Sequence, residues 1–436
     1  MKKKFITIIC LILIVSMMTG CTTFTNFKNA FFASDLVQNE TIKIGVFEPL
    51  SGENKEKGNL ELMGIELANE VKGEVLGKRI ELIVTNNKGE VDVAETVINE
   101  LVATKPSVIL GSYGETMTLI ASDASKTNEI PAIAITSTNP LITINNNYYF
   151  CATFAEEKQG DALADFVYTS ENIKKVATVK ITGDDTSTAV IQRFKSRMKS
   201  LTNDSSCVVG NYKISVNEKD YTETIGKIKA KKAKAVFLNV PPATAEAFLK
   251  QAYNAGLEDV LFVGPKAWND DSFLTYVKNS RKGNVAYAAD YSVDANDTSA
   301  SKKFLKAYKE KYGQDAEPAQ ETAVAYDAYM MAVKAIEDGY NDTLDWDVKK
   351  MVKKASTKEK KEAIKERYNK TVETGIPSGL AIRDALKSIK NYKGASGKIS
   401  YGGSNEAAKT IEIVYYKDGV LVDHGHTVDD KDIIKN

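Results

Sequence analysis

Histidine is almost absent from this chain, and the usual motifs of enzymes are absent too. Among 436 residues the only histidines are His424 and His426, close to the C-terminus. Without further ligands at a suitable spacing they do not define a metal site, and we interpret them as residues of a surface tail. The sequence also has no G-x-S-x-G elbow, no P-loop and no G-x-G-x-x-G after a strand pattern. Serine and threonine side chains therefore lack a general base, and we expect a protein that is not an enzyme and holds no metal or cofactor.

An excess of positive charge is also lacking. The chain contains 58 basic and 58 acidic side chains, so nothing favours binding to the phosphate backbone of nucleic acids. With 43% hydrophobic and 27% charged residues, the composition is that of a globular protein. A length of 436 residues exceeds one ordinary domain of about 100 to 200 residues and predicts at least two lobes.

The apolar run at the N-terminus is too short to cross a bilayer comfortably. It extends from Phe5 to Val15, follows Lys2 to Lys4, and precedes Met18-Thr19-Gly20-Cys21. Small residues before a cysteine at this spacing resemble the bacterial lipobox, in which the signal is removed and the cysteine is lipidated. We therefore expect residues 1–21 to be a lipoprotein signal peptide, Cys21 to carry a lipid anchor, and residues 22–40 to form a tether. An ordinary cleaved signal or an uncleaved anchor is the alternative.

Cysteine is rare beyond this segment. Only Cys151 and Cys207 remain, and they lack the spacing of a metal site. A disulfide between them is the alternative, but a domain of this size does not need a covalent staple. We therefore predict two buried free thiols.

From Thr41 onward, strand patterns alternate with helical ones. In the stretch from Pro106 to Thr143, two strand patterns flank a helical run, and a polar loop follows each strand. Ligands of open α/β sheets bind outside the carboxyl ends of the strands, so these two loops are the first candidates for a binding site. The strand patterns are Ile42 to Phe47, Ile80 to Val84, Val108 to Leu110, Ile130 to Ile135, Tyr148 to Thr153, Lys175 to Ile181, Ala235 to Val240, Val260 to Gly264 and Asn284 to Ala289.

Two parallel sheets flanked by helices are expected rather than one, because a single sheet with this many strands would be unusually wide. The helical patterns Ala300 to Tyr312 and Glu321 to Glu337 follow the second set of strands, and we expect them to return to the first lobe. Near the C-terminus, Lys417-Asp418-Gly419 lies between β-prone runs and predicts a hairpin.

Six motifs occur in a characteristic order: IKIGVFEPLSG, LGKRIELIVTNNKGE, VILGSYGETMTLIASD, IPAIAITSTNP, FLKAYKEKYG and AVAYDAYMMAVKAI. The ordered set, from about Ile42 to the C-terminus, resembles the extracellular solute-binding proteins for branched-chain amino acids. The resemblance implies an α/β fold of the type I periplasmic-binding-protein kind, with two Rossmann-like lobes of parallel sheets flanked by helices and joined by three crossovers. It also implies a ligand enclosed between the lobes and delivery to an ABC permease.

On this basis we expect lobe 1 to contain residues 41–154 and 291–394, and lobe 2 to contain residues 155–290 and 395–436. The segment of about 341–376 interrupts the resemblance and is expected to be a helical insertion. Its lysines alternate with acidic residues, so a solvated helical face is favoured over a membrane or partner surface. We expect a monomer on the extracellular face of the cytoplasmic membrane, anchored there by its lipid.

The resemblance also implies which residues bind the ligand. Glu115 and Thr116 occupy the positions where the family offers small hydroxyl residues to an α-carboxylate, and Glu156 matches an acidic position of the second lobe. Lys266 falls where the family has an acidic partner for the ligand's ammonium group. The full set of expected ligand-binding residues is Lys57, Glu115, Thr116, Thr136, Ser137, Thr138, Glu156, Lys266 and Trp268.

Two of these residues oppose an ordinary zwitterionic amino acid. Glu115 would repel a carboxylate and Lys266 would repel an ammonium group if both were desolvated. The two side chains could pair on closure, the ligand could bind with reversed polarity, the ligand could be something other than an α-amino acid, or the alignment could be shifted. We hypothesise a polar or anionic small metabolite that contacts Lys266. The alternative function is a lipid-anchored sensor that presents its ligand to a membrane receptor without delivering cargo.

Overall fold

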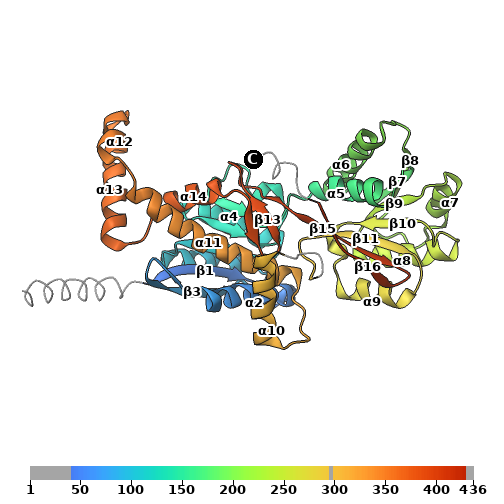
Figure 1. Cartoon of the computed structure of the whole chain (residues 1–436), viewed down its shortest axis with the longest axis horizontal. Coiled ribbons are helices and arrows are strands. Elements are labelled where there is room, and N and C mark those ends of the chain that lie inside the picture. Colours follow the sequence, from blue (N-terminus) through green and yellow to red (C-terminus); the bar gives the residue numbers. More distant parts are fainter. Residues whose placement is uncertain (1–40, 294–297, 429–436) are drawn as a thin grey trace, which may run out of the picture.

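The computed structural model of the protein describes residues 41–293 and 298–428 and shows two α/β lobes (Figure 1). The expected signal peptide, the tether and Cys21 lie outside these residues. So do the side chains of His424 and His426. Within the described ranges, no helix combines the length and the apolar character needed to cross a membrane.

The first lobe is built on a six-stranded sheet with the order β2-β3-β1-β4-β5-β6. All neighbouring pairs are parallel except β2 with β3. Strand β1 lies inside the sheet and is buried at six of its seven residues, as expected for a central parallel strand covered on both faces. The strands are β1 (Ile42–Glu48), β2 (Glu74–Val75), β3 (Lys78–Asn86), β4 (Val108–Gly111), β5 (Ala132–Ala134) and β6 (Tyr149–Cys151).

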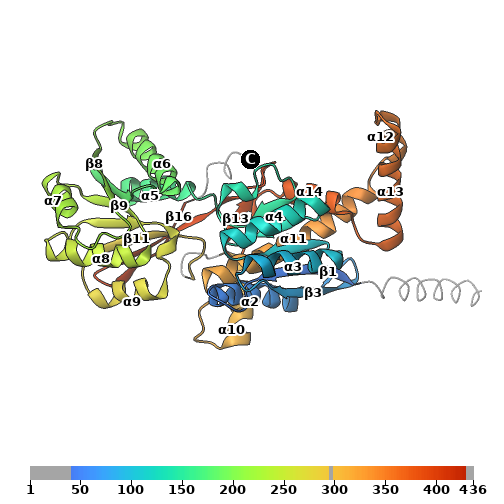
Figure 2. The same cartoon turned by 180° about the vertical axis from the view of Figure 1, so that it is seen from behind.

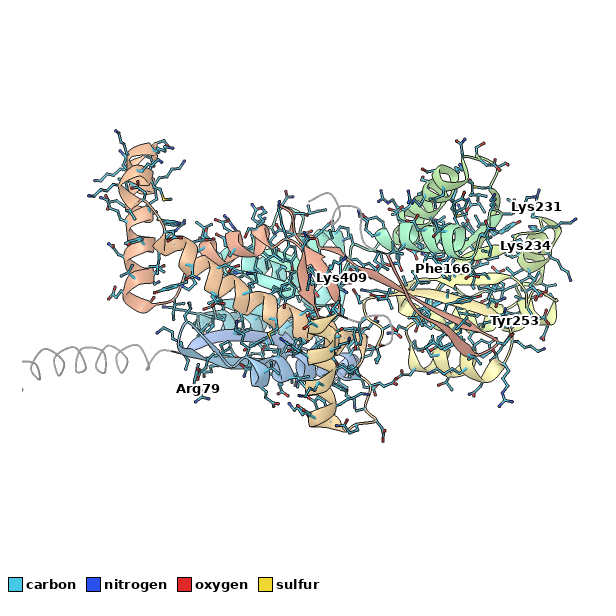
Figure 3. The ribbon with its side chains drawn as sticks, in the orientation of Figure 1. Arg79, Phe166, Lys231, Lys234, Tyr253 and Lys409 are labelled. Atoms are coloured by element: carbon cyan, nitrogen blue, oxygen red, sulfur yellow. The ribbon has the colours of Figure 1, made fainter. Side chains whose placement is uncertain are left out.

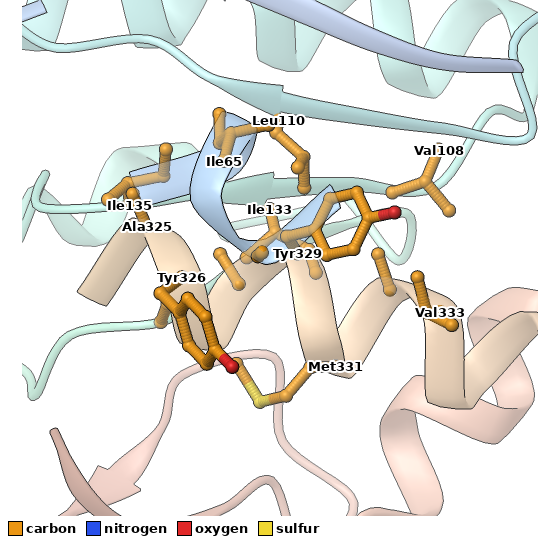
Figure 4. Close-up of a cluster of buried hydrophobic side chains, with 14 of the residues drawn as sticks. Ile65, Val108, Leu110, Ile133, Ile135, Ala325, Tyr326, Tyr329, Met331 and Val333 are labelled. Carbon is orange, nitrogen blue, oxygen red and sulfur yellow. The ribbon is translucent and has the colours of Figure 1, made fainter. Parts of the chain in front are cut away.

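Helices cover both faces of this sheet. Helices α2 (Lys55–Val71) and α11 (Gln320–Leu344) pack on one face, and Tyr329 and Val333 of α11 lie among strand residues such as Leu110 (Figure 4). Helices α3 (Val91–Ala103) and α4 (Glu115–Asn128) cover the other face, which is turned to the viewer in Figure 2. Helices α10 (Ser299–Tyr312) and α14 (Gly379–Ser388) complete the lobe. The two helices expected to return, α10 and α11, both contribute to the core of the first lobe.

The segment expected to be a helical insertion forms two helices, α12 (Val348–Lys354) and α13 (Lys358–Thr374). They pack on each other and project from the end of the first lobe that is remote from the second lobe (Figure 1). Most of their lysines are exposed, which agrees with the expected solvated face.

The second lobe contains a seven-stranded sheet with the order β16-β15-β11-β10-β9-β7-β8. Its β7 to β11 strands are parallel, whereas β15 and β16 are antiparallel additions at one edge. The turn between these two strands contains Asp418 and Gly419 at positive φ, so the predicted hairpin is confirmed. The strands are β7 (Val176–Ile181), β8 (Val208–Ile214), β9 (Ala235–Asn239), β10 (Leu261–Gly264), β11 (Asn284–Ala289), β15 (Ile411–Lys417) and β16 (Val420–Val428).

The second sheet is also covered on both faces. Helices α5 and α6 pack on one face, where Phe194 contacts Phe237 of β9, and α7, α8 and α9 pack on the other. The helical elements are α5 (Lys158–Asp165), the π-helical turn η2 (Phe166–Ser170), α6 (Asp185–Thr202), α7 (Thr222–Ala230), α8 (Pro242–Asn254), the 3₁₀ turn η3 (Lys266–Trp268) and α9 (Asp271–Ser280).

The chain passes between the lobes three times: after β6, after β11, and before β15. A small sheet, β12 (Tyr392–Gly394), β13 (Gly397–Ser400) and β14 (Ala408–Lys409), precedes the third passage. This small sheet packs on the first lobe, because Ile399 and Tyr401 are part of the first-lobe core. The Asp327 carboxylate of α11 also accepts hydrogen bonds from the backbone N–H groups of Ala395 (2.6 Å) and Ser396 (2.7 Å). We therefore propose that the last return to lobe 2 lies near residue 411 instead of residue 395.

Candidate functional site

A cleft of about 420 Å³ lies between the two lobes. Both lobes contribute to its wall, as expected for a site at the carboxyl ends of parallel strands. The lining residues are Lys57, Tyr113, Gly114, Glu115, Thr136, Ser137, Thr138, Glu156, Pro242, Lys266, Ala267, Asn269, Asp270, Gln320 and Glu321.

The two polar loops of the Pro106–Thr143 stretch form the first-lobe wall. The loop after β4 brings Tyr113 and Glu115 to the cleft, and the loop after β5 brings Thr136, Ser137 and Thr138. Neighbouring strands β4 and β5 run parallel, so both loops leave the same edge of the sheet and meet. Both loops therefore line the cleft, and their contact with a ligand stays a prediction.

Two buried carboxyl groups lie directly behind this wall. Glu61 of α2 accepts a hydrogen bond from the hydroxyl of Thr136, and Glu48 at the end of β1 accepts one from the Tyr113 backbone N–H at 2.8 Å. Burial raises the pKa of Glu61 to about 7, and burial together with the neighbouring Glu61 raises the pKa of Glu48. Among the described residues, Oε1 of Glu48 and Oε2 of Glu61 have no hydrogen-bond partner. A proton shared between the two carboxyl groups would satisfy both oxygens.

Glu156 connects the two walls of the cleft. It follows the first crossover, and its carboxylate accepts hydrogen bonds from Thr138 Oγ1 and from Gln159 Nε2, both at 2.6 Å. The Gln159 side-chain oxygen in turn accepts a hydrogen bond from the Lys266 backbone N–H at 2.9 Å. This chain of contacts fixes the position of Glu156 between the first-lobe loop and the second-lobe turn η3.

Lys266 lies at the junction of the lobes. Its Nζ is 2.9 Å from Asp290 Oδ2, 3.0 Å from Thr153 Oγ1 and 3.1 Å from the Thr136 carbonyl oxygen. An ammonium group has three N–H donors, so these contacts use all of them. Lys266 therefore pairs with Asp290 and not with Glu115, and it has no free donor for a ligand in this conformation.

Asp290 is the centre of a buried network that includes one residue from each of the three crossovers. Thr153 donates to its carboxylate at 2.7 Å. Lys409, labelled in Figure 3, is fully buried, and its Nζ donates to the Asp290 backbone oxygen at 2.7 Å and lies 3.2 Å from Oδ1. Burial alone would raise the pKa of Asp290, but the Lys266 and Lys409 ammonium groups lower it to about 2. The network holds the three connecting segments together at one point.

Two of the expected ligand-binding residues do not line the cleft. Trp268 is fully buried because its ring folds back over Gly264, where a Cβ atom would lie 2.2 Å from the ring, and its indole N–H donates to the Val240 carbonyl at 2.9 Å. Thr116 is exposed on the first turn of α4. These two predictions are corrected: Trp268 supports the second-lobe core, and Thr116 lies outside the wall.

The remaining expected residue, Lys57, does line the cleft. Its Nζ is 2.6 Å from Oε1 of Glu321 at the start of α11. Among the described residues, no group of three or more histidine, cysteine, aspartate or glutamate side chains could hold a metal ion. The described wall residues offer a solute carboxylates, hydroxyls, amides, backbone groups and the Lys57 ammonium group beside Glu321.

Comparison with known proteins identifies the family. A model described as "Periplasmic binding protein" matches residues 41–419. The chain belongs to the periplasmic binding protein family. The family and its structural neighbours are substrate-binding proteins and not enzymes.

Relatives of this periplasmic binding protein are distant. Leu/Ile/Val-binding protein homolog 2 of Brucella abortus (strain 2308) is 24% identical over 266 residues, which cover 59% of this chain and 65% of that protein, slightly less than two thirds of its length. The leucine-, isoleucine-, valine-, threonine-, and alanine-binding protein of Pseudomonas aeruginosa is also 24% identical over 266 residues, covering 59% of this chain and 69% of that protein.

Solved structures confirm the predicted fold. A leucine binding protein, LivK of Thermotoga maritima, has a TM-score of 0.64 and 21% identity, covering 90% of this chain and 100% of that one. LivJ of Streptococcus pneumoniae, in complex with isoleucine, has a TM-score of 0.66 and 22% identity, with coverage of 89% and 100%. A solute binding protein of Rhodopseudomonas palustris BisB5, in complex with 3,4-dihydroxy benzoic acid, has a TM-score of 0.63 and 22% identity, with coverage of 89% and 98%. At these identities the likeness shows the fold alone.

Several residues of the cleft in this periplasmic binding protein were missed by the sequence analysis. Gln320 and Glu321 come from the first turn of α11, almost 200 residues after the first-lobe loops, and only the return of that helix places them in the wall. Asp270 had a local signal, because an aspartate before the α9 pattern marks a helix N-cap, and its side chain accepts a hydrogen bond from the Phe273 N–H. That signal concerned helix formation and did not reveal that Asp270 faces the cleft.

Proposed function

We propose that this protein captures a small polar solute, an amino acid or a related metabolite, in the cleft between its lobes and delivers it to an ABC importer. We further propose that it does so on the extracellular face of the cytoplasmic membrane, as a monomer anchored through a lipid on Cys21.

The observation that carries the proposal is the cleft itself. A volume of about 420 Å³ lies within the range of small-molecule sites, and both lobes supply polar groups to it. Three crossovers join the lobes, so a hinge motion can close the walls on a solute and exclude water. A micromolar affinity corresponds to about 8 kcal/mol, which hydroxyl, carboxylate and amide contacts in a closed cleft can supply without catalytic groups.

We assign ligand contact to the lining residues Glu115, Ser137, Thr138, Glu156 and Asp270. Thr136 is assigned a supporting position, because its hydroxyl donates to Glu61 and its carbonyl oxygen accepts from Lys266. Lys57 and Lys266 are assigned to the two ion pairs at the cleft margins.

The test is a thermal-shift screen of the purified protein with amino acids, carboxylates, amides, amines and nucleosides, followed by calorimetry and small-angle X-ray scattering with each hit. We expect at least one solute to raise the melting temperature, to bind with 1:1 stoichiometry, and to reduce the radius of gyration as the lobes close. Ser137→Ala is expected to weaken that binding, and Ser356→Ala, at an exposed position outside the cleft, is the matched control. Binding by no member of the panel would overturn solute capture.

The anchor and the transporter are tested separately. Metabolic labelling with a radioactive fatty acid is expected to mark the wild-type protein and not Cys21→Ser. Affinity purification from solubilised membranes is expected to recover a permease in the presence of the ligand. Recovery of a receptor without a permease would support the sensor alternative and contradict delivery.

A further inference from the structure

The charges of the cleft wall are not balanced. Six charged side chains line it: Lys57, Glu115, Glu156, Lys266, Asp270 and Glu321. Both lysines already have carboxylate partners, Lys57 with Glu321 at 2.6 Å and Lys266 with Asp290 at 2.9 Å. Within the part of the chain that the structure describes, Glu115, Glu156 and Asp270 form no ion pair with a basic side chain. The wall therefore presents three carboxylates whose charge is not compensated by the protein.

These carboxylates come from different parts of the wall. Glu115 begins α4 in the first lobe and accepts one long hydrogen bond, 3.3 Å, from Asn139 Nδ2. Asp270 precedes α9 in the second lobe, and Glu156 lies between the lobes next to Thr138. A carboxylate has about four acceptor positions, so each of the three retains capacity for N–H donors of a ligand.

A buried hydroxyl supplies an independent indication of a ligand. Ser137 lines the cleft, is only 7% exposed, and its Oγ has no hydrogen-bond partner among the described residues. A buried polar atom without a partner is unfavourable, so a ligand group that hydrogen-bonds to it removes that penalty. Ser137 lies beside Thr138, whose hydroxyl contacts Glu156, so the free hydroxyl and an uncompensated carboxylate share one end of the wall.

The positive groups offer little to an anion. All three donors of the Lys266 ammonium are used by Thr136, Thr153 and Asp290. Lys57 faces Glu321, and a ligand carboxylate at this place would also face that glutamate. An anionic metabolite therefore finds no free N–H donor on Lys266 in this conformation. The negative charge of the wall favours a positively charged ligand instead.

We propose that the cleft selects a small organic cation whose positive group carries N–H donors, such as a primary amine or a guanidinium, with a net positive charge at neutral pH. This inference rests on the proposed function and names the solute class of the same site. Ammonium N–H groups would donate to Glu115, Glu156 or Asp270 and to Ser137 Oγ. A quaternary ammonium ion has the charge without the donors, so it is expected to bind poorly.

Calorimetry with the purified protein tests the class directly. The cationic probes are 1,4-diaminobutane, agmatine, lysine and arginine, and the comparison probes are 1,4-butanediol, choline, leucine and glutamate. We expect at least one cationic probe to bind at least tenfold more tightly than every comparison probe, and its affinity to fall as the salt concentration rises. If choline, leucine, glutamate or butanediol binds more tightly, the inference is wrong and solute capture stands. If nothing binds in the wider panel, solute capture itself fails.

Substitutions connect the result to the wall. Glu115→Gln keeps the size of the side chain and removes its charge, and we expect it to weaken binding of the cationic probe at least fivefold. Asp270→Asn is a second variant, and its asparagine can still cap α9. Glu95→Gln on the exposed face of α3 is the matched control and should leave the affinity unchanged. Melting curves without ligand verify that each variant is folded, and unchanged affinity in both Glu115→Gln and Asp270→Asn would overturn the proposal.

Discussion

Replacing Asp290 by asparagine is expected to destabilise the protein strongly, because the substitution removes the only carboxylate between two buried ammonium groups in the described network. Asp290 and Lys409 are 0% exposed and Lys266 is 14% exposed. Removing one partner of a buried ion pair costs about 3 to 5 kcal/mol, because the remaining charge stays buried without compensation. Here two such charges would remain, so we expect Asp290→Asn to lie at or above the upper end of this range.

The shift in the pKa of Asp290 gives a second, smaller value for the stabilising free energy. A fall from 3.8 to about 2 corresponds to about 2 kcal/mol at 1.36 kcal/mol per pKa unit, and it measures only the preference of the folded protein for the charged carboxylate. Because the folded-state pKa is depressed, this contribution is fully present above about pH 3.8 and is lost as the pH falls through about 2.

Urea denaturation followed by circular dichroism measures the effect. Asp259→Asn at an exposed position is the matched control and should change the free energy of unfolding by less than about 0.5 kcal/mol. The double variant Asp290→Asn/Lys409→Met removes one of the uncompensated charges and should recover part of the loss. A loss below about 1 kcal/mol in Asp290→Asn, or a double variant less stable than the single one, would refute the reasoning.

Three further predictions concern packing, protonation and the thiols. Gly64→Ala should destabilise the protein by about 1 to 3 kcal/mol, because its Cβ would lie 2.2 Å from the Thr322 carbonyl oxygen where α2 meets α11. Gly226→Ala in α7, whose added Cβ would have no atom within 4 Å, should be neutral or stabilising by up to about 1 kcal/mol. Equal free energies of unfolding of the two variants in urea would contradict this. Glu61→Gln should stabilise the protein by up to about 3 kcal/mol at pH 8 and have little effect near pH 4.5. The pKa of the Glu61 carboxyl is raised from 4.5 to about 7, so the wild type loses stability as the pH rises through that range. Parallel pH profiles of the melting temperature in wild type and variant would exclude this cause. Cys151 and Cys207 are both free and buried, and burial raises the pKa of Cys151 to about 12. The thiol reagent 5,5′-dithiobis(2-nitrobenzoic acid) should therefore label them only after denaturation. Rapid labelling of the native protein would disprove their burial.

The buried network and the cleft have a common consequence for the proposed hinge motion. Asp290 ties Thr153, Lys409 and its own segment together, so the three crossovers can bend only as one unit near this point. Lys266 adds a contact from the second lobe to the Thr136 carbonyl of the first lobe. A motion that separates η3 from the loop after β5 must break this contact, so the Lys266 side chain is placed to influence how far the lobes open.

The comparison of the expected and observed strands shows which features local sequence can predict. The pattern of Asn284 to Ala289 predicted β11 with its observed bounds, and Val108 to Leu110 predicted all but one residue of β4. Both are central strands, buried on nearly every residue, and their apolar runs are clear. Strand β8 was missed, because it is an edge strand whose sequence VVGNYKI mixes glycine, asparagine and lysine with apolar residues, and only Ile214 is fully buried.

For the residues of the cleft, too, local sequence predicted some positions and tertiary packing decided others. The two loops were predicted because each directly follows a strand pattern, and parallel strands bring their carboxyl ends to one edge. Glu115 and Thr136 to Thr138 were assigned to the ligand within these loops by the family resemblance, and all four line the cleft. Trp268 was included among the ligand-binding residues that the family resemblance implied. In the structure its ring turns inward over Gly264, which has no side chain to prevent this. Which of two neighbouring side chains faces the cleft was decided by packing in the second-lobe core.

By itself, the sequence determined the alternation of strands and helices, the division into two sheets and the two loops of Pro106 to Thr143, because these follow from local periodicity and strand order. Only the tertiary structure decided the electrostatics of the site. Glu321 returns on α11 to pair with Lys57, and Asp290 comes from the second crossover to pair with Lys266. Ion pairs form between residues that are close in space, whatever their separation along the chain. Because both lysines of the wall pair with distant carboxylates, the folded structure alone leaves Glu115, Glu156 and Asp270 without a basic partner among the described residues.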